Sequence, residues 1–216
     1  MIETRPYAIS YDAHGNRLSR VNLLNSDLSE TYSYDNLNQL ISFTRGSHTR
    51  SWGYDAQGNW QSVVTDGSTQ TRTHNAQNEI TSISGAVTPT YDANGNLTTD
   101  ETGRQFIYDA WDRLVEVRDG SGVTLKRYAY DGLHRRISET AGGVTIDLYY
   151  SDGWQVLEER VSGQAQVQYV WSPVYVDALV LRDRDTDGDG SFDERLWVVQ
   201  DANYNITAIF DNAGNV

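Results

Sequence analysis

The residues with the clearest potential for chemistry lie in one acidic stretch, residues 183–194, with the sequence DRDTDGDGSFDE. Six of its twelve side chains are carboxylates, and small residues separate most of them. Ca²⁺ takes oxygen ligands from loops of this kind, and crowded carboxylates repel one another when no cation is present. The stretch therefore predicts a Ca²⁺-binding loop. The alternative is a solvated acidic hairpin tip, which is the usual state of a charge run.

Two registers of the loop fit the sequence. A start at Asp183 satisfies the EF-hand pattern, with Asp183, Asp185, Asp187 and the closing Glu194. A start at Asp185 uses Asp185, Asp187, Asp189, the Ser191 carbonyl and Asp193, but it places Leu196 where a bidentate acid belongs. We favour the second register, because Phe192 can then anchor the loop and Asp183 can end its strand. Glu194 remains a further candidate ligand.

The elements that must position this loop are strands. Its flanks, VYVDALVLRD and ERLWVVQ, are rich in β-branched and aromatic residues, as strands are. A Ca²⁺ loop between two strands, without the helices of an EF-hand, is suited to stiffening a hairpin rather than to sensing.

A repeated motif organises the rest of the chain. It first occurs as YDAHGNRL at residues 11–18, and related copies begin at Tyr34, Tyr54, His74, Tyr91, Tyr108 and Tyr130. A period near 20 residues predicts a repeat architecture, in which each unit buries its apolar face only against its neighbours.

Each motif reads as a tight turn. Asp is favoured at the first position of a type I turn, and Gly is favoured at the fourth. The predicted first and fourth residues are Asp12–Gly15, Asp35–Asn38, Asp55–Gly58, Asn75–Asn78, Asp92–Gly95, Asp109–Asp112, Asp131–His134, Asp201–Tyr204 and Asp211–Gly214. Eight of the nine fourth residues are Gly, Asn, Asp or His, the types that best tolerate positive φ. The repeated motif therefore specifies a backbone conformation.

A second class of turn lies between the motifs, at Gly46, Gly67, Gly85, Gly120, Gly142 and Gly163. Each repeat then holds two turns and two strands of about 6–8 residues, and segments such as RLVEVRD alternate apolar and polar residues. We predict an all-β antiparallel meander. About 20 strands at ~4.8 Å spacing would span ~95 Å, so the sheet should coil into a spiral or a wide, barrel-like wrap.

The organisation predicted along the chain has two parts. Residues 1–156 hold regular repeats, and residues 157–216 form a degenerate repeat region with the acidic hairpin loop at 183–194. Because repeat units bury their apolar faces only against neighbours, we do not expect either part to form a compact domain.

Composition excludes several classes of function. The net charge of −13 opposes binding to nucleic acid. No run of 18 apolar residues predicts a membrane span, and the start, MIETRPYAIS, lacks the features of a secretory signal. Cysteine is absent, so disulfides and thiolate metal sites are excluded.

No catalytic residue is predicted. His14, His48, His74 and His134 lie in or beside predicted turns, and no hydrolase, zinc-protease or phosphate-loop motif occurs. A carboxylate pair for glycoside hydrolysis stays open, because such pairing is spatial.

Two other functions also stay open. One is carbohydrate or cell-surface binding through the tryptophans Trp52, Trp60, Trp111, Trp154 and Trp171. The other is self-association, in which free edge strands pair with other copies of the chain.

The motifs YDAHGNRL, YDAQGN, YDANGNL and YDAWDRLVEV resemble the YD repeats of the RHS (rearrangement hot spot) family. The resemblance covers residues 11–156 strongly and resumes at VQDANYNITAIFDNAGNV. It implies a spiral β-sheet that forms a hollow shell around a toxic C-terminal cargo domain, or that presents a large surface, in a secreted or cell-surface bacterial protein.

The sequence departs from that family in two respects. It contains no DP dipeptide, and so nothing that matches the DPxG-type core segment where RHS shells cleave themselves. No cargo domain follows the repeats. We therefore expect a fragment of the shell, structural in function, without self-cleavage activity.

Overall fold

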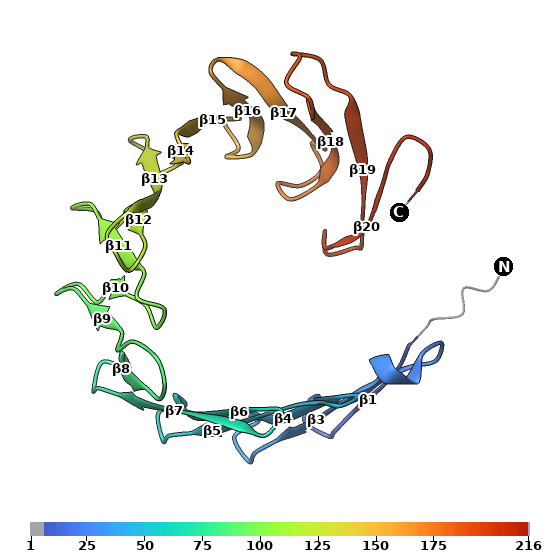
Figure 1. Ribbon diagram of the computed structural model, residues 1–216. Helices are drawn as coiled ribbons and strands as arrows, with labels where there is room; N and C mark the ends of the chain where they lie inside the picture. Colours follow the sequence, from blue (N-terminus) through green and yellow to red (C-terminus); the bar gives the residue numbers. More distant parts are fainter. Residues whose placement is uncertain (1–6, 216) are drawn as a thin grey trace. The chain divides into compact units, whose positions relative to one another are not determined.

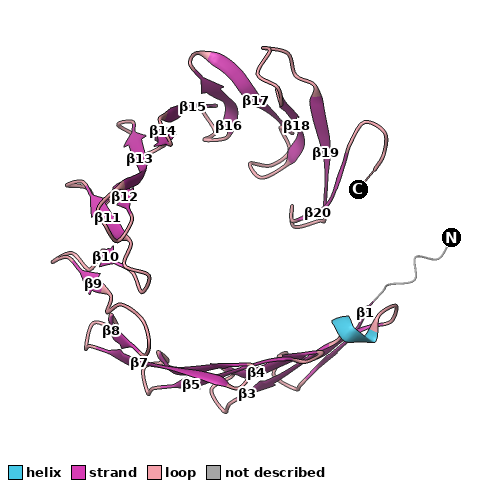
Figure 2. Ribbon diagram, viewed as in Figure 1, coloured by secondary structure: helices cyan, strands magenta, loops and turns pink. Residues whose placement is uncertain are grey.

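The computed structural model describes residues 7–215, and these residues are almost entirely strand and turn (Figures 1 and 2). Residues 1–6, which begin the stretch assessed for a secretory signal, lie outside the described residues. Twenty strands form two antiparallel sheets of 8 and 12 strands, in each of which the strands follow one another in sequence order. The predicted all-β antiparallel meander is confirmed. Within the described part of the chain, the one helical element is a short 3₁₀ turn, and no helix is long and apolar enough to cross a membrane.

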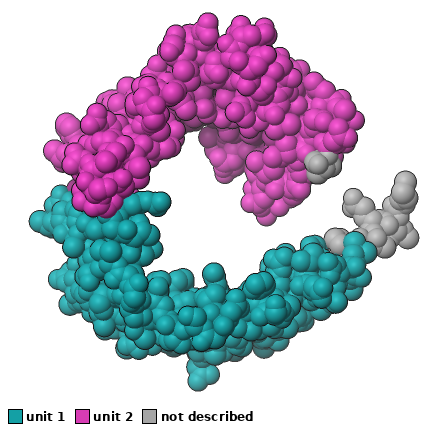
Figure 3. All heavy atoms as spheres, in the orientation of Figure 1, with its two compact units in different colours: residues 1–104 teal, residues 105–216 magenta. Residues whose placement is uncertain are grey.

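Contacts divide the chain into two compact units, residues 1–104 and residues 105–216 (Figure 3). The sequence-based division at residue 156 separates regular from degenerate repeats, and it stays a prediction. The hydrogen-bonded ladder continues through residue 156, where β15 pairs with β16 and β16 with β17.

Unit 1 consists of ten strands and the 3₁₀ turn η1. They are β1 (Tyr7–Tyr11), β2 (Arg17–Asn22), η1 (Ser26–Leu28), β3 (Glu30–Tyr34), β4 (Leu40–Arg45), β5 (His48–Tyr54), β6 (Trp60–Thr65), β7 (Ser68–His74), β8 (Ile80–Ile83), β9 (Thr90–Tyr91) and β10 (Leu97–Thr99). Strands β1 to β8 form the 8-stranded sheet. Asn25 caps η1, because its side chain accepts a hydrogen bond from the Asp27 N–H.

The two faces of the unit 1 sheet differ in chemistry. One face carries small hydroxyl side chains that meet across neighbouring strands, such as Ser10 with Ser19 at 2.7 Å and Thr73 with Ser82 at 2.7 Å. The other face carries aromatic pairs, such as Trp52 and Trp60 with ring centroids 6.2 Å apart. This separation follows from the two-residue period of a strand.

Unit 2 consists of the ten remaining strands. They are β11 (Gln105–Tyr108), β12 (Leu114–Arg118), β13 (Thr124–Tyr130), β14 (Arg136–Ala141), β15 (Val144–Tyr150), β16 (Val156–Val161), β17 (Gln164–Trp171), β18 (Leu179–Arg184), β19 (Glu194–Gln200) and β20 (Ile206–Phe210). Within the unit, strands that are consecutive in sequence pair with each other, from β11 to β20.

Neither unit has a large buried core. Among the described residues, the buried hydrophobic side chains are Ile83, Leu148, Ala178 and Leu181. A domain that folds around a hydrophobic interior buries far more than this. Stability must therefore come mainly from strand pairing, half-buried faces and the turns.

Candidate functional site

All nine predicted turns share one backbone geometry. The N–H of the fourth residue donates to the carbonyl of the first, at 3.0–3.2 Å. In each of these turns the fourth residue has a positive φ, from 59° at Asp112 to 88° at Gly58. The residue after the turn then closes the hairpin, as where the Asp12 N–H donates to the Asn16 carbonyl at 2.9 Å. A β-bulge accompanies the turn. Ser10 pairs with Ser19 but the next residue, Tyr11, pairs with Arg17, so the register shifts by one residue.

Asp is favoured as the first residue of the turn because its carboxylate accepts hydrogen bonds from the backbone N–H groups of the turn. In Asp109, one oxygen accepts from the N–H groups of Trp111 and Arg113, at 2.9 and 3.1 Å. The other accepts from the Arg113 guanidinium at 2.8 Å. Hydrogen bonds from Arg113, followed by the backbone groups, hold the pKa of Asp109 below its ordinary value.

At several motif turns the side chain of the fifth residue reaches along the sheet to the next motif turn. Asn16 Nδ2 donates to Asn38 Oδ1 at 2.7 Å, and Asn59 Nδ2 donates to Asn78 Oδ1 at 2.9 Å. Arginine takes the same role in unit 2, where Arg135 Nη1 donates to the Ser151 carbonyl at 3.4 Å. These bonds link successive turns along one edge of the sheet, and we call the set the turn ladder.

At several turns the aromatic residue before the turn adds a second series of links. The Tyr130 hydroxyl donates to the Leu114 carbonyl at 2.8 Å, and the Tyr150 hydroxyl donates to the Arg136 carbonyl at 2.7 Å. Trp171 keeps this function where the repeat is degenerate, because its Nε1 donates to the Val156 carbonyl at 2.7 Å. Each link joins the end of one strand to the start of the strand before it, as where Tyr130 at the end of β13 reaches Leu114 at the start of β12.

Three further turns of the same type were missed by sequence reasoning. Gly103 N–H donates to Asp100, Gly122 N–H to Asp119 and Trp154 N–H to Ser151, each at the carbonyl and at 3.0–3.2 Å. The assignment of Gly120 to the second class of turn was wrong, because Asp119 begins a four-residue turn that ends at Gly122. The D-x-x-G spacing in DETG and DGSG was the signal for the first two.

The acidic loop 185–193 connects β18 to β19, on the edge opposite the turn ladder of unit 2. Carboxylate oxygens of Asp185, Asp187 and Asp189 lie within 4.8 Å of one another. Asp185 is only 3% exposed, and its oxygens accept from the N–H groups of Gly188 and Gly190 at 2.7 and 2.8 Å. The loop backbone therefore wraps around the Asp185 carboxylate, with the other two carboxylates beside it.

The remaining candidate ligands are engaged elsewhere. Asp183 accepts two hydrogen bonds from Arg195, at 2.7 and 2.6 Å, and these lower its pKa. Glu194 forms an ion pair with Arg182. Asp193 accepts from the N–H and hydroxyl of Thr186, at 2.9 and 2.7 Å. The structure thus brings together the first three residues of the Asp185 register and holds Asp183 and Glu194 in cross-strand ion pairs.

The apolar residue of the loop does not act as the predicted anchor. Phe192 is exposed and lines a shallow depression with Arg195 and Asn212. Backbone hydrogen bonds to Asp185 hold the loop instead.

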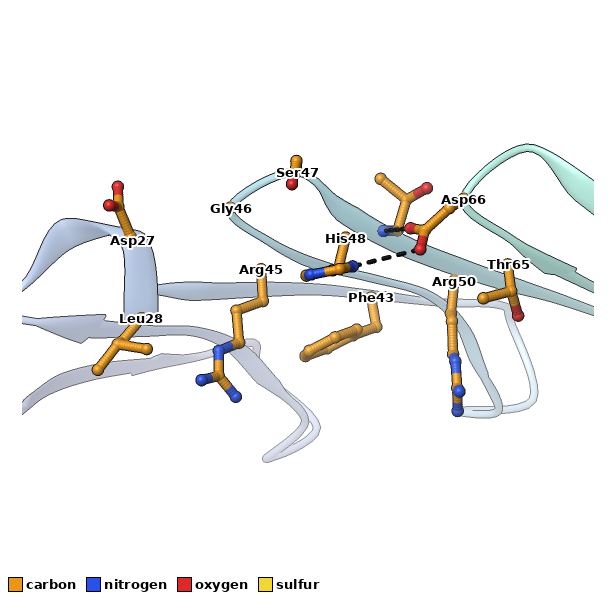
Figure 4. Close-up of a pocket in the computed structure, with 11 residues that line it drawn as sticks. Asp27, Leu28, Phe43, Arg45, Gly46, Ser47, His48, Arg50, Thr65 and Asp66 are labelled. Atoms are coloured by element: carbon orange, nitrogen blue, oxygen red, sulfur yellow. Dashed lines mark hydrogen bonds and ion pairs between the residues drawn. The ribbon is translucent and has the colours of Figure 1, made fainter.

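A hollow in unit 1 lies at the tips of the β4–β5 and β6–β7 hairpins (Figure 4). Asp66 accepts from the Thr49 N–H at 2.7 Å and lies 3.2 Å from His48 Nδ1, so it ties the two tips together. Arg45 and Arg50 extend on either side of the Phe43 ring (Figure 4). The His48–Asp66 pair is largely exposed, and no hydroxyl or thiol nucleophile contacts it among the described residues.

A ladder of hairpins with repeated Asp turns and no buried core defines a β-sheet wall of the YD-repeat class. The chain belongs to the teneurin YD-shell family, whose model matches residues 6–216. The resemblance to RHS and YD-repeat proteins is therefore confirmed. Membership of a shell family indicates a structural, non-catalytic segment.

The relatives of similar sequence include a tRNA nuclease and a DNA deaminase toxin. The chain is 34% identical over 134 residues to the tRNA nuclease WapA of Bacillus subtilis strain 168, which covers 58% of this chain and 6% of that protein. It is 32% identical over 141 residues to double-stranded DNA deaminase toxin A of Burkholderia cenocepacia strain H111, covering 61% of this chain and 8% of the relative. The chain thus spans less than a tenth of the length of these relatives.

Solved structures agree on the fold. The crystal structure of TcdB2-TccC3 without its hypervariable C-terminal region matches 96% of this chain and 12% of the solved chain, with a TM-score of 0.52 and 15% identity. The TcdB2-TccC3-Cdc42 structure matches the same shares with a TM-score of 0.50 and 16% identity. At this identity the likeness concerns the fold alone.

Proposed function

We propose that this chain is a segment of a shell wall, in a larger secreted or surface-exposed protein, that encloses or displays a C-terminal toxin or other cargo domain. The main support for this proposal is that strands pair in sequence order while very few hydrophobic side chains are buried. Such a ladder makes a wall that can be extended by adding repeats, because each repeat needs only its neighbours. The name of the deaminase toxin supports a toxin as the cargo, and the length of both relatives supports a larger parent protein.

Protease protection in the native full-length protein tests this function. Leu148 is buried in β15, so Leu148→Asp should breach the wall, because an unpaired buried charge strongly destabilises its surroundings. Val123 is exposed in a turn, so Val123→Asp is the matched control. We expect the domain that follows the wall to resist protease in the native protein and in the control, and to be cleaved in Leu148→Asp. Equal cleavage in all three would contradict enclosure.

We also propose that the acidic loop binds Ca²⁺ and stiffens the β18–β19 hairpin. The support is the donor set, since Asp185, Asp187 and Asp189 place three carboxylates within 4.8 Å of one another. Ca²⁺ prefers such oxygen ligands, and a cation would remove the repulsion among them. Asp183 and Glu194 lie outside this ligand set because their ion pairs with Arg195 and Arg182 engage them.

Thermal unfolding with and without Ca²⁺ tests this site. Ligand at 100 times its Kd stabilises a folded protein by about 2.7 kcal/mol, so CaCl₂ should raise the Tm and EDTA should reverse the change. The variant Asp187→Asn with Asp189→Asn keeps side-chain oxygens that accept from the loop N–H groups but removes two charges. It should lose the response, whereas Asp183→Asn should keep it. An unchanged Tm in wild type would remove the site while leaving the wall function intact.

A further inference from the structure

A row of exposed apolar side chains follows the ladder edge of unit 2, at the three turns that begin at Asp109, Asp131 and Ser151 and at the next turn along this edge, the loop 172–178. The members are Trp111, Leu133, Trp154, Val174 and Tyr175, with exposed fractions between 48% and 75%. We call this set the apolar turn row. In unit 1 the third turn position is polar at four of five motif turns, with His14, Gln57, Gln77 and Asn94, while Leu37 is apolar. The row thus belongs to one part of unit 2 rather than to the repeat itself, since the last two motif turns of unit 2 carry Asn203 and Ala213 at this position.

Trp154 occupies a backbone position that an aromatic residue normally avoids. Its φ is 70°, at the fourth position of the turn begun by Ser151. This conformation costs an L-residue roughly 1–2 kcal/mol, and glycine escapes the cost. Burial does not offset it, because more than half of the Trp154 surface is exposed. A strained, exposed aromatic residue is a feature that points to a function of its own.

The rings of the row are held in place before any partner arrives. The Arg113 guanidinium lies 5.0 Å from the Trp111 ring centroid, and an ion pair with Asp109 at 2.7 Å fixes it. Arg135 lies 5.8 Å from the Trp154 ring in the same way. Pre-positioned side chains lose little conformational entropy on binding. Trp, Tyr and Arg are also the residue types that dominate protein–protein hot spots.

The spacing of the row and the net charge of the chain define a partner. Successive motif turns are two strands apart, ~9.6 Å at ordinary strand spacing, and one heptad of an α-helix advances ~10.5 Å. The four turns from Trp111 to Tyr175 therefore span ~29 Å, the length of a helix of about 20 residues. The aliphatic members Leu133 and Val174 suit apolar protein side chains better than sugar rings. The chain carries a charge of −13, which favours a basic partner.

We propose that the apolar turn row of unit 2 binds an amphipathic helix of a partner protein, with apolar residues repeating about every seven positions and basic residues on its flanks. The helix lies along the turn edge and places one apolar layer at each motif turn. This interaction is separate from the wall function, since it uses the turn tips and leaves both sheet faces free.

Titration of this protein with a synthetic peptide tests the proposal. The probe is a helix of about 20 residues with Leu at the a and d heptad positions and Lys elsewhere. A scrambled peptide of the same composition, without an apolar face, controls for charge. We expect saturable binding of the probe, seen as a change in tryptophan fluorescence and in peptide helicity, and at least about tenfold weaker binding of the scrambled peptide. Binding of the probe should persist in ~0.5 M NaCl, because apolar contact is not screened.

Substitutions assign the binding to the row. Trp111→Ala combined with Trp154→Gly should weaken binding by about tenfold or more while leaving the fold intact, as the Tm would show. Trp60→Ala removes a similarly exposed tryptophan in unit 1 and should change nothing. The proposal is overturned if both peptides bind equally, if the double variant binds like wild type, or if the probe does not bind. Saturable binding of cellohexaose that depends on the same two tryptophans would overturn it in favour of a glycan.

Discussion

Asn16 and Asn38 lie 22 residues apart in sequence, and Asn16 Nδ2 donates a hydrogen bond of 2.7 Å to Asn38 Oδ1. Asn38 has φ 61° and is the fourth residue of the next motif turn. The residue that gives one turn its left-handed corner is therefore also the acceptor for the turn before it. This double use explains why Asn is accepted at that position, where Gly would relieve the backbone but offer no side-chain oxygen.

Removal of the Asn16 side chain should measure how much the Asn16–Asn38 hydrogen bond contributes to the free energy of unfolding. Asn16→Ala deletes the bond to Asn38 and a bond to Asp12 within its own turn, at 2.9 Å. Asn205→Ala is the matched control, because Asn205 bonds to Asp201 within its turn and makes no side-chain bond to another turn among the described residues. A single hydrogen bond contributes about 0.5–1.5 kcal/mol, and Asn16→Ala should destabilise the chain by that much more than the control. Equal losses of stability in urea unfolding would mean that the turn ladder contributes nothing.

The tyrosine links predict a second difference between two conservative changes. Tyr130→Phe removes the hydroxyl that donates to the Leu114 carbonyl at 2.8 Å and leaves the ring, so the free energy of unfolding should fall by about 1 kcal/mol. Tyr149 is exposed, and its hydroxyl donates no hydrogen bond within the described residues. Tyr149→Phe should therefore leave the Tm unchanged. A neutral result at Tyr130 would show that the ring, rather than the hydroxyl, explains the tyrosine of the motif.

The carboxylates predict how stability depends on pH. Hydrogen bonds from Arg118, and then from Thr124, lower the pKa of Glu116 from 4.5 to about 2, and the pKa of Asp109 is lowered by Arg113. A group whose pKa is lower in the folded state stabilises the fold above its unfolded pKa and loses that contribution as the pH falls through the folded value. The Tm should therefore be steady near neutral pH and decline from about pH 4.5 toward pH 2.

The variant Glu116→Gln separates this carboxylate from the others. Glutamine does not titrate, so the decline between pH 4.5 and about 2 should be shallower than in wild type. A curve parallel to that of wild type would show that Glu116 is not coupled to folding. The other carboxylates with lowered pKa values, such as Asp109 and Asp183, would then account for the acid response.

The turns could be predicted from sequence because they are local. The spacing of Asp12 and Gly15 specifies a conformation of four consecutive residues, and local hydrogen bonds are enough to fix it. The same logic extends to DETG at residues 100–103, which reasoning from the YD motif alone overlooked. What local reasoning cannot supply is the register between strands, on which every link from one turn to the next depends.

The acidic loop shows the same limit. Asp183 and Glu194 belong to the acidic run in sequence, so both were predicted as possible ligands. The β18–β19 register places Arg195 opposite Asp183 and sets Arg182 diagonally across from Glu194. The ion pairs of Arg195 with Asp183 and of Arg182 with Glu194 use both carboxylates. Asp185, the first residue of the favoured register, accepts hydrogen bonds from N–H groups of its own loop. These contacts are local in sequence.

Two glycines allow the backbone explanation of the repeat to be tested without any change in packing. Gly15 has φ 86°, Gly132 does not have a positive φ, and a Cβ at either position would meet no atom within 4 Å. Gly15→Ala therefore adds only the cost of a left-handed conformation, about 1–2 kcal/mol. Gly132→Ala restricts the unfolded chain and should be neutral or stabilising by about 0.4–1 kcal/mol. Opposite shifts in Tm would show that the fourth position of the motif is selected for its backbone geometry, whereas equal losses at both sites would mean that the missing side chain matters for another reason.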